Sequence, residues 1–419
     1  MRTQTPISVG MLPLLIGIVT LFAGFPSGSS KFTIEPCSNA SPCSSLVGYT
    51  LYTDLKVSEV ATLFSADPIS ILLANSIDIS VADVESHVLS EGIFLKVPVK
   101  CSCVDGIFKS AFVKYTTRPN DTPTYVADVI YSGLVSADQI KDGNPGAVGS
   151  DPSTLSAGTV LWIPLPCTCF NGTDNNLPAI YMSYVVQQAD TLQMIAGNYF
   201  TTVNDLMTVN SLASNDISPG DILAIPLSAC ASNFPSYASD FALSVPNGSY
   251  AITAGRCVLC SCGPDSHNLR CMPAPLEDSC SSMQCRSSNL MLGNVTVQQT
   301  SGGCNVTSCS YGGFVNNTIV TVLSSSLQPR CSGAQQFPPL FALPSEAPKT
   351  MYSPAPAPLV AGGPITTSSP VPSSNSVVSF PPANSPPGIS SSPCSLQNPL
   401  SRFPIAVVLV LFVKFVTFL

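Results

Sequence analysis

The sequence has 419 residues, of which only 10% are charged, and its 24 acidic and 16 basic residues give a net charge of −8. A weakly charged, acidic chain lacks the basic surface with which proteins bind nucleic acid. Its 17 cysteines and 39 prolines instead favour a secreted protein with disulfides and extended proline-rich segments.

Residues 1–30 have the features of a secretory signal peptide. Arg2 supplies the positive amino-terminal region, Met11 to Phe25 form an apolar run, and Gly28-Ser29-Ser30 supply small residues for cleavage. A retained membrane anchor is the alternative, although the apolar run is short for a span. Secretion places the chain in an oxidising compartment, so its cysteines are expected to form disulfides.

A seven-residue pattern, Gly-x-x-Leu-x-(Val/Ile)-Pro, occurs three times, at residues 92–98, 158–164 and 220–226. Each copy closes a longer unit that opens on a tyrosine, and an alanine stands twelve residues after that tyrosine. The tyrosines are Tyr49, Tyr115 and Tyr184, and the alanines are Ala61, Ala127 and Ala196. We name the repeats unit 1 (49–100), unit 2 (113–166) and unit 3 (182–228).

Unit 3 shows the predicted secondary structure most clearly. A short β-type run at 183–186 is followed by an apolar stripe with helical spacing, formed by Leu192, Ile195, Ala196 and Tyr199. A second helix is predicted to begin after Thr202, which has a carboxylate three residues on, and a second strand covers 222–225. The predicted order is β-α-α-β.

Units 1 and 2 keep this plan. The helical stripe reads Val57, Val60, Ala61 and Phe64 in unit 1, and Val126, Ala127 and Ile130 in unit 2. Asp67-Pro68 is a typical start for the second helix of unit 1, and Ser136 with Gln139 predicts the start in unit 2. Counted from the first tyrosine of the unit, the second helix of unit 2 starts three residues later than in units 1 and 3. Asn144 is also three residues later than Asn75 and Asn210, so one insertion of three residues explains both shifts.

The repeats resemble the lysin motif (LysM). Asp121-Thr122 and Asp190-Thr191 match its opening, whereas unit 1 departs with Leu55-Lys56. Three such units joined by Cys-x-Cys, here Cys101-Ser-Cys103 and Cys167-Thr-Cys169, are similar to the ectodomains of plant LysM receptors. The chain as a whole resembles GPI-anchored LysM receptor-like proteins of the peptidoglycan-binding branch, related to chitin-elicitor-binding proteins. The resemblance implies an α+β fold of three LysM units clamped by disulfides.

Six cysteines lie between residues 31 and 169. The first two belong to an amino-terminal disulfide segment at 31–48, and the other four form the two junctions. Residues i and i+2 of an extended segment lie about 6.6 Å apart, which exceeds the roughly 3.5–4.5 Å between the Cβ atoms of a disulfide. The two cysteines of one junction therefore bond to different partners, and fifteen pairings remain open. The resemblance implies the pairs Cys37–Cys103, Cys43–Cys169 and Cys101–Cys167. Zinc binding by the junctions or by Cys260-Ser-Cys262 is the less favoured alternative.

Residues 230–331 form a cysteine-rich module with ten cysteines, an even number. We expect a small strand-rich domain held by disulfides, with its best strand at 317–323. Seven Asn-x-Ser/Thr sequons predict N-glycosylation on the surface of a secreted chain. They are Asn39, Asn120, Asn171, Asn247, Asn294, Asn305 and Asn316.

The carboxyl-terminal part changes in composition. Residues 332–392 are rich in Pro and Ser and are predicted to form a disordered, extended stalk. Residues 391–419 match a GPI-anchor signal, with small residues, a spacer and an apolar tail, and Ser390 is the predicted attachment site. A transmembrane anchor is the alternative, and Lys414 within the apolar tail argues against it.

Catalysis finds little support in the sequence. His87 and His267 are far apart and have no metal-ligand spacing, and hydrolase, zinc-protease and kinase motifs are missing. We therefore predict a binding protein that is not an enzyme and needs no cofactor or metal.

Glycan binding is the better interpretation. In LysM units the sugar lies between the loop that joins strand 1 to helix 1 and the loop that joins helix 2 to strand 2, and in related chitin receptors the second unit carries the site. Loops that merely turn the chain are the alternative. The predicted glycan-binding residues are Arg118, Pro119, Asn120, Asp121, Thr122, Pro123 and Thr124 in the first loop, and Val148, Gly149, Ser150, Asp151, Pro152, Ser153 and Thr154 in the second.

Three functions are weighed. The favoured one is a receptor subunit on the outer face of the plasma membrane that binds peptidoglycan, or else chitin, in plant innate immunity. It would signal through a LysM receptor kinase, and a long glycan could bridge it into a homo-oligomer. A structural wall-adhesion protein and a wall-remodelling hydrolase are the alternatives.

Overall fold

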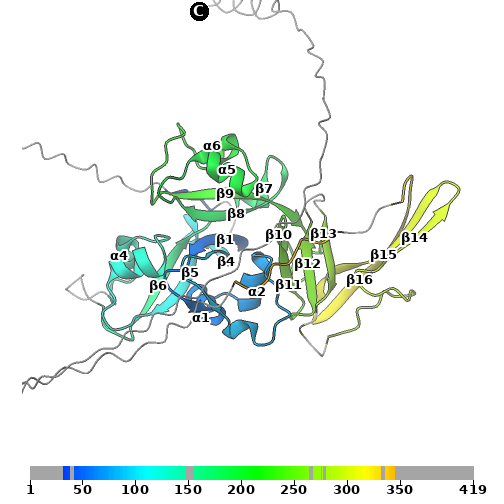
Figure 1. The fold of residues 1–419 in the computed structure, drawn as a ribbon, viewed down its shortest axis with the longest axis horizontal. Coiled ribbons are helices and arrows are strands. Elements are labelled where there is room, and N and C mark those ends of the chain that lie inside the picture. Colours follow the sequence, from blue (N-terminus) through cyan, green and yellow to red (C-terminus); the bar gives the residue numbers. More distant parts are fainter. Residues whose placement is uncertain are drawn as a thin grey trace, which may run out of the picture. The chain divides into compact units, whose positions relative to one another are not determined.

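The computed structural model describes residues 32–37, 42–147, 155–263, 268–274, 276, 280–331 and 336–344 (Figure 1). The predicted signal peptide, the GPI signal with Ser390, the sequon Asn39, His267 and most of the predicted stalk lie outside these residues. The stalk residues 336–344 are described, and for them the prediction of a disordered segment is wrong, because Phe341 makes backbone hydrogen bonds with unit 1 and the carbonyl of Pro338 accepts the Tyr250 hydroxyl. All described residues belong to one compact unit of the chain.

The three repeats have the predicted order of strands and helices. Unit 1 contains β1 (Cys43–Thr50), β2 (Leu55–Lys56), α1 (Val57–Phe64), α2 (Pro68–Ala74), the single-turn helix η1 (Val84–Ser86), β3 (Val88–Leu89) and β4 (Phe94–Val104). Unit 2 contains β5 (Phe108–Thr116), α3 (Pro123–Tyr125), η2 (Val126–Ile130), α4 (Ala137–Gly143) and β6 (Val160–Pro166). The turn η3 (Phe170–Gly172) and β7 (Thr173–Asp174) lead into unit 3, which contains β8 (Leu177–Val185), α5 (Leu192–Tyr199), α6 (Val203–Val209) and β9 (Ile222–Ala231).

One continuous sheet runs through all three units, in the order β10-β9-β8-β1-β4-β5-β6. Strand β4 makes this possible because it is long: its first part pairs with β1, and its end, Ser102–Val104, pairs with β5 of unit 2. Strands β1 and β8 run parallel and join unit 3 to unit 1. In Figure 1, α5 and α6 lie beside β8 and β9.

The predicted starts of the second helices are confirmed. The Asp67 carboxylate accepts the backbone N–H of Ser70 at 2.8 Å, and Ser136 and Gln139 form a reciprocal capping box. In unit 3 the Thr202 hydroxyl oxygen accepts the backbone N–H of Asp205 at 3.0 Å. These caps satisfy amide groups that would otherwise have no partner at a helix start.

The first helix of unit 2 differs from the prediction. Residues Val126–Ile130 form a π-helical turn instead of a regular α-helix, and the Tyr131 N–H donates to the carbonyl of Val126 at 3.0 Å. A π-turn takes up one extra residue in a helix. The three-residue insertion of unit 2 is therefore partly absorbed inside its first helix.

An asparagine makes the same three hydrogen bonds in every unit. In unit 3 the Asn210 Nδ2 donates to the carbonyls of Leu206 and Ala224 at 2.8 and 2.9 Å, and its Oδ1 accepts the Ala224 N–H at 2.7 Å. Asn75 and Asn144 bond in the same way to Lys96 and Trp162. The side chain thus ties the end of helix 2 to strand 2. We call this the asparagine frame.

The glycine that opens each closing pattern is needed for its backbone conformation. Gly92, Gly158 and Gly220 have φ values of 81°, 81° and 89°, in the region that glycine adopts without steric cost. Each glycine N–H donates to the carbonyl two residues after the unit's first tyrosine, at 2.8 to 2.9 Å. The pattern therefore marks the turn that brings strand 2 back beside strand 1.

Units 1 and 2 share one hydrophobic core, whereas unit 3 has a core of its own. The Tyr49 hydroxyl donates to the carbonyl of Ile130 at 3.0 Å, and the Tyr131 hydroxyl donates to the carbonyl of Leu63 at 3.2 Å. The rings of Tyr131 and Phe64 pack edge to face across the same contact. The helix ends of units 1 and 2 are thus joined by buried aromatic side chains.

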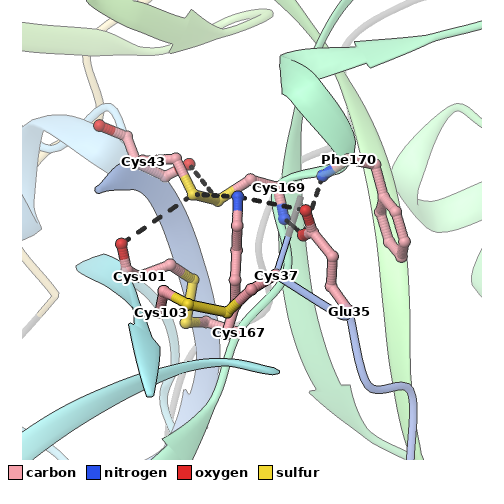
Figure 2. Close-up of polar contacts among 10 residues, drawn as sticks. Glu35, Cys37, Cys43, Cys101, Cys103, Cys167, Cys169 and Phe170 are labelled. Carbon is pink, nitrogen blue, oxygen red and sulfur yellow. Dashed lines mark hydrogen bonds and ion pairs between the residues drawn. A yellow bond between two sulfur atoms is a disulfide. The ribbon is translucent and has the colours of Figure 1, made fainter. Parts of the chain in front are cut away.

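Three disulfides surround a buried ion pair where the repeats meet (Figure 2). The bridges are Cys37–Cys103, Cys43–Cys169 and Cys101–Cys167, the same pairs that the resemblance implies. Lys109 Nζ lies 3.2 Å from Glu35 Oε1, and the two side chains are 2% and 5% exposed. The other carboxylate oxygen of Glu35 accepts the backbone N–H groups of Cys169 and Phe170. We call residues 32–228 held by this centre the head.

The cysteine-rich module is built of strands, as expected. Its strands are β10 (Ser244–Pro246), β11 (Tyr250–Thr253), β12 (Val258–Cys262), β13 (Leu269–Pro273), β14 (Val295–Thr300), β15 (Gly303–Val315) and β16 (Thr318–Gln328). The strand predicted at 317–323 is confirmed as the first part of β16. Its ten cysteines form the bridges Cys230–Cys262, Cys257–Cys280, Cys260–Cys271, Cys285–Cys309 and Cys304–Cys331.

Candidate functional site

The first loop of unit 2 is folded around Asp121. Its buried carboxylate accepts the Tyr115 hydroxyl at 2.6 Å and the backbone N–H of Arg118 at 2.7 Å. Thr122 caps the following helix, since its hydroxyl oxygen accepts the Tyr125 N–H at 3.0 Å. The side chains of Asp121 and Thr122 are therefore engaged within the loop.

The exposed residues of this loop are Arg118, Pro119, Asn120 and Thr124. Asn120 has φ at +70°, which an asparagine tolerates better than most residues, and which turns the loop at its tip. The Arg118 guanidinium donates to the Tyr52 hydroxyl of unit 1 at 3.3 Å, so the loop is tied to the neighbouring repeat. Of the seven predicted residues, these four are accessible from outside.

The second predicted loop of unit 2, Val148 to Thr154, lies outside the described residues. Leu155, the described residue that follows it, lies beside the first loop. The N–H of Leu155 donates to the carbonyl of Asp121 at 3.2 Å, and Thr117 and Thr159 are joined by a backbone bond of 2.9 Å. The structure thus brings the first loop into contact with the residue that follows the second loop.

Unit 3 repeats this arrangement with both loops described. The Asp190 carboxylate accepts the Tyr184 hydroxyl and the backbone N–H of Gln187, each at 2.8 Å. Its second loop, 211–219, has 9 residues between the frame asparagine and the turn glycine, against 13 in unit 2 and 16 in unit 1. Burial, together with its own hydrogen bond to the Asp190 carboxylate, raises the pKa of Tyr184 above its ordinary value. The Tyr–Asp pair is therefore a structural element of the opening turn.

Unit 1 differs because Leu55 stands where the other units have this aspartate. Without the carboxylate, the Tyr49 hydroxyl bonds to unit 2 instead. Strand β2 of the first loop pairs directly with β3 of the second loop, matching Leu55 with Leu89 and Lys56 with Val88. The two loops that would border a sugar are thus joined by backbone hydrogen bonds.

The second loop of unit 1 is also covered by later parts of the chain. Arg256 of the cysteine-rich module forms ion pairs with Asp67 and Glu85, and Phe341 makes backbone bonds with Ser76 and Asp78. These contacts could not be predicted from the sequence, because neither segment repeats or shows a periodic pattern. They cover part of the loop surface of unit 1.

The described sequons lie at the surface. Asn305, in β15, is half-buried. The other five are exposed: Asn120, Asn171, Asn247, Asn294 and Asn316. Asn120 is the one that falls in a predicted sugar-binding loop. A glycan there would share the loop with any ligand.

Both cysteine groups considered as zinc sites form disulfides in the structure. Cys260 is bonded to Cys271 and Cys262 to Cys230, and the four junction cysteines are all bridged. Among the described residues, no single helix is long and apolar enough to cross a membrane. Helices α1 and α2 reach the necessary length and apolarity only when they are taken together, and the two helices are bent by 100° where they meet.

Comparison with known proteins places these features in a family. The LysM domain model matches residues 184–226, which is unit 3. LysM domain-containing GPI-anchored protein 1 of Arabidopsis thaliana is 63% identical over 79% of this chain and 79% of its own length. The chain belongs to the plant LysM domain-containing GPI-anchored proteins.

Other relatives agree with this assignment. The LysM domain-containing GPI-anchored protein LYP6 of Oryza sativa subsp. japonica is 54% identical over 92% of this chain and 93% of its own length. The chitin elicitor-binding protein of the same organism is 27% identical over 74% of this chain and 87% of its own. As a GPI-anchored LysM protein, this chain resides on the extracellular face of the plasma membrane.

Proposed function

We propose that this LysM protein is a cell-surface receptor subunit of plant innate immunity that binds glycans containing N-acetylglucosamine. Bacterial peptidoglycan is the preferred ligand and chitin the second. N-acetylglucosamine offers an amide N–H, a carbonyl and a methyl group, which backbone groups of two facing loops and a small apolar surface can recognise without charge. This chemistry suits a chain with 10% charged residues.

In this proposal all three repeats are LysM units. The observation that carries it is the shared construction of the repeats. Unit 3, which the LysM model matches, has the asparagine frame, and Asn75 and Asn144 build the same frame in units 1 and 2. The turn glycines also share one backbone conformation.

The proposed binding site is the groove of unit 2, between residues 118–124 and 148–154. Support comes from the contrast with unit 1, whose corresponding loops are paired and covered. In unit 2 the inward-facing Asp121 holds the loop, while Arg118, Pro119, Asn120 and Thr124 remain exposed to contact a sugar chain. The sugar-binding surface is thus built on a fixed turn.

We propose recognition and not catalysis for this protein, and we propose that a partner passes the signal on. A GPI anchor reaches only the outer leaflet, so ligand binding must be communicated to a protein that crosses the membrane. A LysM receptor kinase fits this role. Binding is expected to persist in cells that lack such kinases, while the response to peptidoglycan fragments is lost; an unchanged response there would refute the partner.

The binding site can be tested with one substitution at three equivalent positions. Ser58, Thr124 and Gln193 each stand nine residues after the first tyrosine of their unit. Tryptophan at each position adds bulk beside one loop only, and sedimentation on insoluble peptidoglycan, chitin and cellulose measures binding. Thr124→Trp should lose most of the bound fraction, and Ser58→Trp should not. Loss with Gln193→Trp alone would move the site to unit 3.

The sequon in the loop offers a second test. If a glycan on Asn120 shares the groove, Asn120→Gln should increase the fraction bound to peptidoglycan, whereas Asn171→Gln, at an exposed turn between units 2 and 3, should leave it unchanged. Equal binding by both variants and the wild type would show that no glycan restricts the site.

A further inference from the structure

The residue that ends the first helix of unit 3 is unusual. Phe200 is 93% exposed, and its backbone is left-handed, with φ at +55°. That conformation costs a residue with a Cβ about 1–2 kcal/mol, and a bulky side chain there is a true outlier. Because its side chain is almost fully exposed, Phe200 buries very little apolar surface against the described chain, and a large apolar side chain is a poor choice for such a position unless something else covers it.

The other units show what this position does. After the first helix, the N–H groups of Ala66, Gly133 and Thr201 donate to the carbonyls of the three repeat alanines, each at 3.0 Å. The residues just before these donors are therefore equivalent. They are Ser65, Ser132 and Phe200, with φ values of 50°, 50° and 55°.

In units 1 and 2 this helix end is a contact between units. The Ser132 hydroxyl donates to the carbonyl of Thr50 at 2.7 Å, and the preceding Tyr131 donates to the carbonyl of Leu63 at 3.2 Å. The carbonyl of Ile130, equivalent to that of Leu63, accepts the Tyr49 hydroxyl. Each helix end thus has its last carbonyl satisfied by a tyrosine of the other unit.

In unit 3 the same groups have no such neighbour. The residue equivalent to Tyr131 is Tyr199, and the carbonyl equivalent to that of Leu63 belongs to Asn198. Within the part of the chain that the structure describes, neither the Tyr199 hydroxyl nor this carbonyl has a hydrogen-bond partner. Three consecutive residues at the end of α5 therefore offer a donor, an acceptor and an exposed aromatic ring, and the half-buried Tyr199 ring is held in place by its contacts with Phe94 and Tyr184.

We propose that this surface, formed by residues 198–200, is where two copies of the protein associate, unit 3 against unit 3. Across a two-fold axis a surface meets itself, so a donor and an acceptor on one copy match an acceptor and a donor on the other. Each Tyr199 hydroxyl would donate to the partner's Asn198 carbonyl, as Tyr131 does to Leu63. The two Phe200 rings pack together at the centre.

A second copy fits better than a charged partner. Helix α5 has no acidic residue in its first turn and no basic residue in its last, and the sequence Leu192–Tyr199 contains no charge at all. The helix therefore adds no charge to a contact between two acidic chains. The nearby carboxylate of Asp190, which acts electrostatically on Tyr199, is engaged within its own loop by Tyr184 and Gln187. The range 182–228 also contains no N-glycosylation sequon that would add bulk there.

The test uses the mature protein, released from cells by phosphatidylinositol-specific phospholipase C, in sedimentation velocity over a range of concentrations. The wild type should form dimers. Phe200→Ser, which places the residue of units 1 and 2 at this position, should weaken association at least tenfold. The control is Phe241→Ser in the cysteine-rich module. It removes another phenylalanine whose side chain is exposed (56%), and it should leave association unchanged.

A second variant separates association from folding. Tyr199→Phe removes only the hydroxyl, which has no partner within its described chain, so thermal stability should stay unchanged while association weakens about five- to tenfold. A wild type that stays monomeric would overturn the proposal, and so would dimers that both variants leave intact. The proposal would also be overturned if Phe200 were needed only for association with other proteins and not for association between two copies. Binding of a short soluble peptidoglycan fragment, which occupies one site and gains nothing from avidity, should be the same for Phe200→Ser and the wild type, and this keeps the test independent of the proposed sugar site.

Discussion

Replacing Lys109 by methionine should destabilise the head by about 3–5 kcal/mol, the cost of removing one partner of a buried ion pair. The Lys109 and Glu35 side chains are 2% and 5% exposed, so water cannot solvate the carboxylate that remains. Methionine fills most of the space of the lysine stem, which limits any cavity. The lost partner charge therefore accounts for most of the effect.

The loss can be measured by thermal unfolding of the secreted protein with its disulfides intact. For a unit of this size, 1 kcal/mol shifts the melting temperature by about 2–4 °C, so we expect a decrease of roughly 6–20 °C. Lys141→Met is the matched control, because Lys141 pairs with the exposed Asp138 at 3.2 Å and such pairs contribute little. It should melt within about 3 °C of the wild type.

A double variant identifies the cause. Glu35→Gln with Lys109→Met removes both charges, and its loss should be clearly smaller than the sum of the two single losses. If Lys109→Met melts like Lys141→Met, or if the single losses simply add, the ion pair does not stabilise the head and the reasoning fails.

Three further predictions follow from described contacts. Asn210→Ala should cost about 1–3 kcal/mol in chemical denaturation, because the Ala224 N–H and two carbonyls lose their partner; a loss no larger than that of Asn215→Ala, in an exposed loop, would count against the asparagine frame. Burial raises the pKa of Tyr49 and Tyr115 above the ordinary value and that of Tyr199 to about 12. The unfolded chain loses these protons near pH 10 while the folded chain keeps them, so stability should fall above pH 10 by about 1.4 kcal/mol per pH unit for each such tyrosine, and a flat denaturation midpoint between pH 10 and 11.5 would contradict this. Phe200→Gly should raise the stability of the monomer by roughly 1 kcal/mol, since glycine adopts the left-handed conformation freely; a lower melting temperature at dilutions that exclude dimers would refute it.

Features that repeat could be predicted from the sequence. The spacing of Leu192, Ile195 and Ala196 gave the first helix of unit 3, and side chains with cap chemistry, such as Asp67 and Ser136, gave the helix starts. These signals are local, because a helix buries one face and must satisfy its first amide groups. The π-turn in unit 2 could not be predicted, because a regular α-helix and a helix with one extra residue in its last turn show the same stripe of apolar residues.

Contacts between distant segments could not be predicted. Glu35 and Lys109 are separated by the whole of unit 1, and neither stands in a repeated pattern. Arg256 and Phe341 cover unit 1 through single side chains and single backbone bonds. In the candidate site, the sequence identified the correct turn residue in Asp121 but not its direction, since only the fold shows that its carboxylate bonds to Tyr115.

The bridge between Cys43 and Cys169 has a consequence for how the protein is made. The two cysteines are 126 residues apart, and at a synthesis rate of about 5–20 residues per second, Cys169 is made roughly 6–25 s after Cys43. During that time Cys101 and Cys103 become available first, so Cys43 can form a wrong bridge that must later be exchanged. Formation of the native Cys43–Cys169 bridge is therefore expected to depend on disulfide exchange, which takes seconds to hours, as well as on translation.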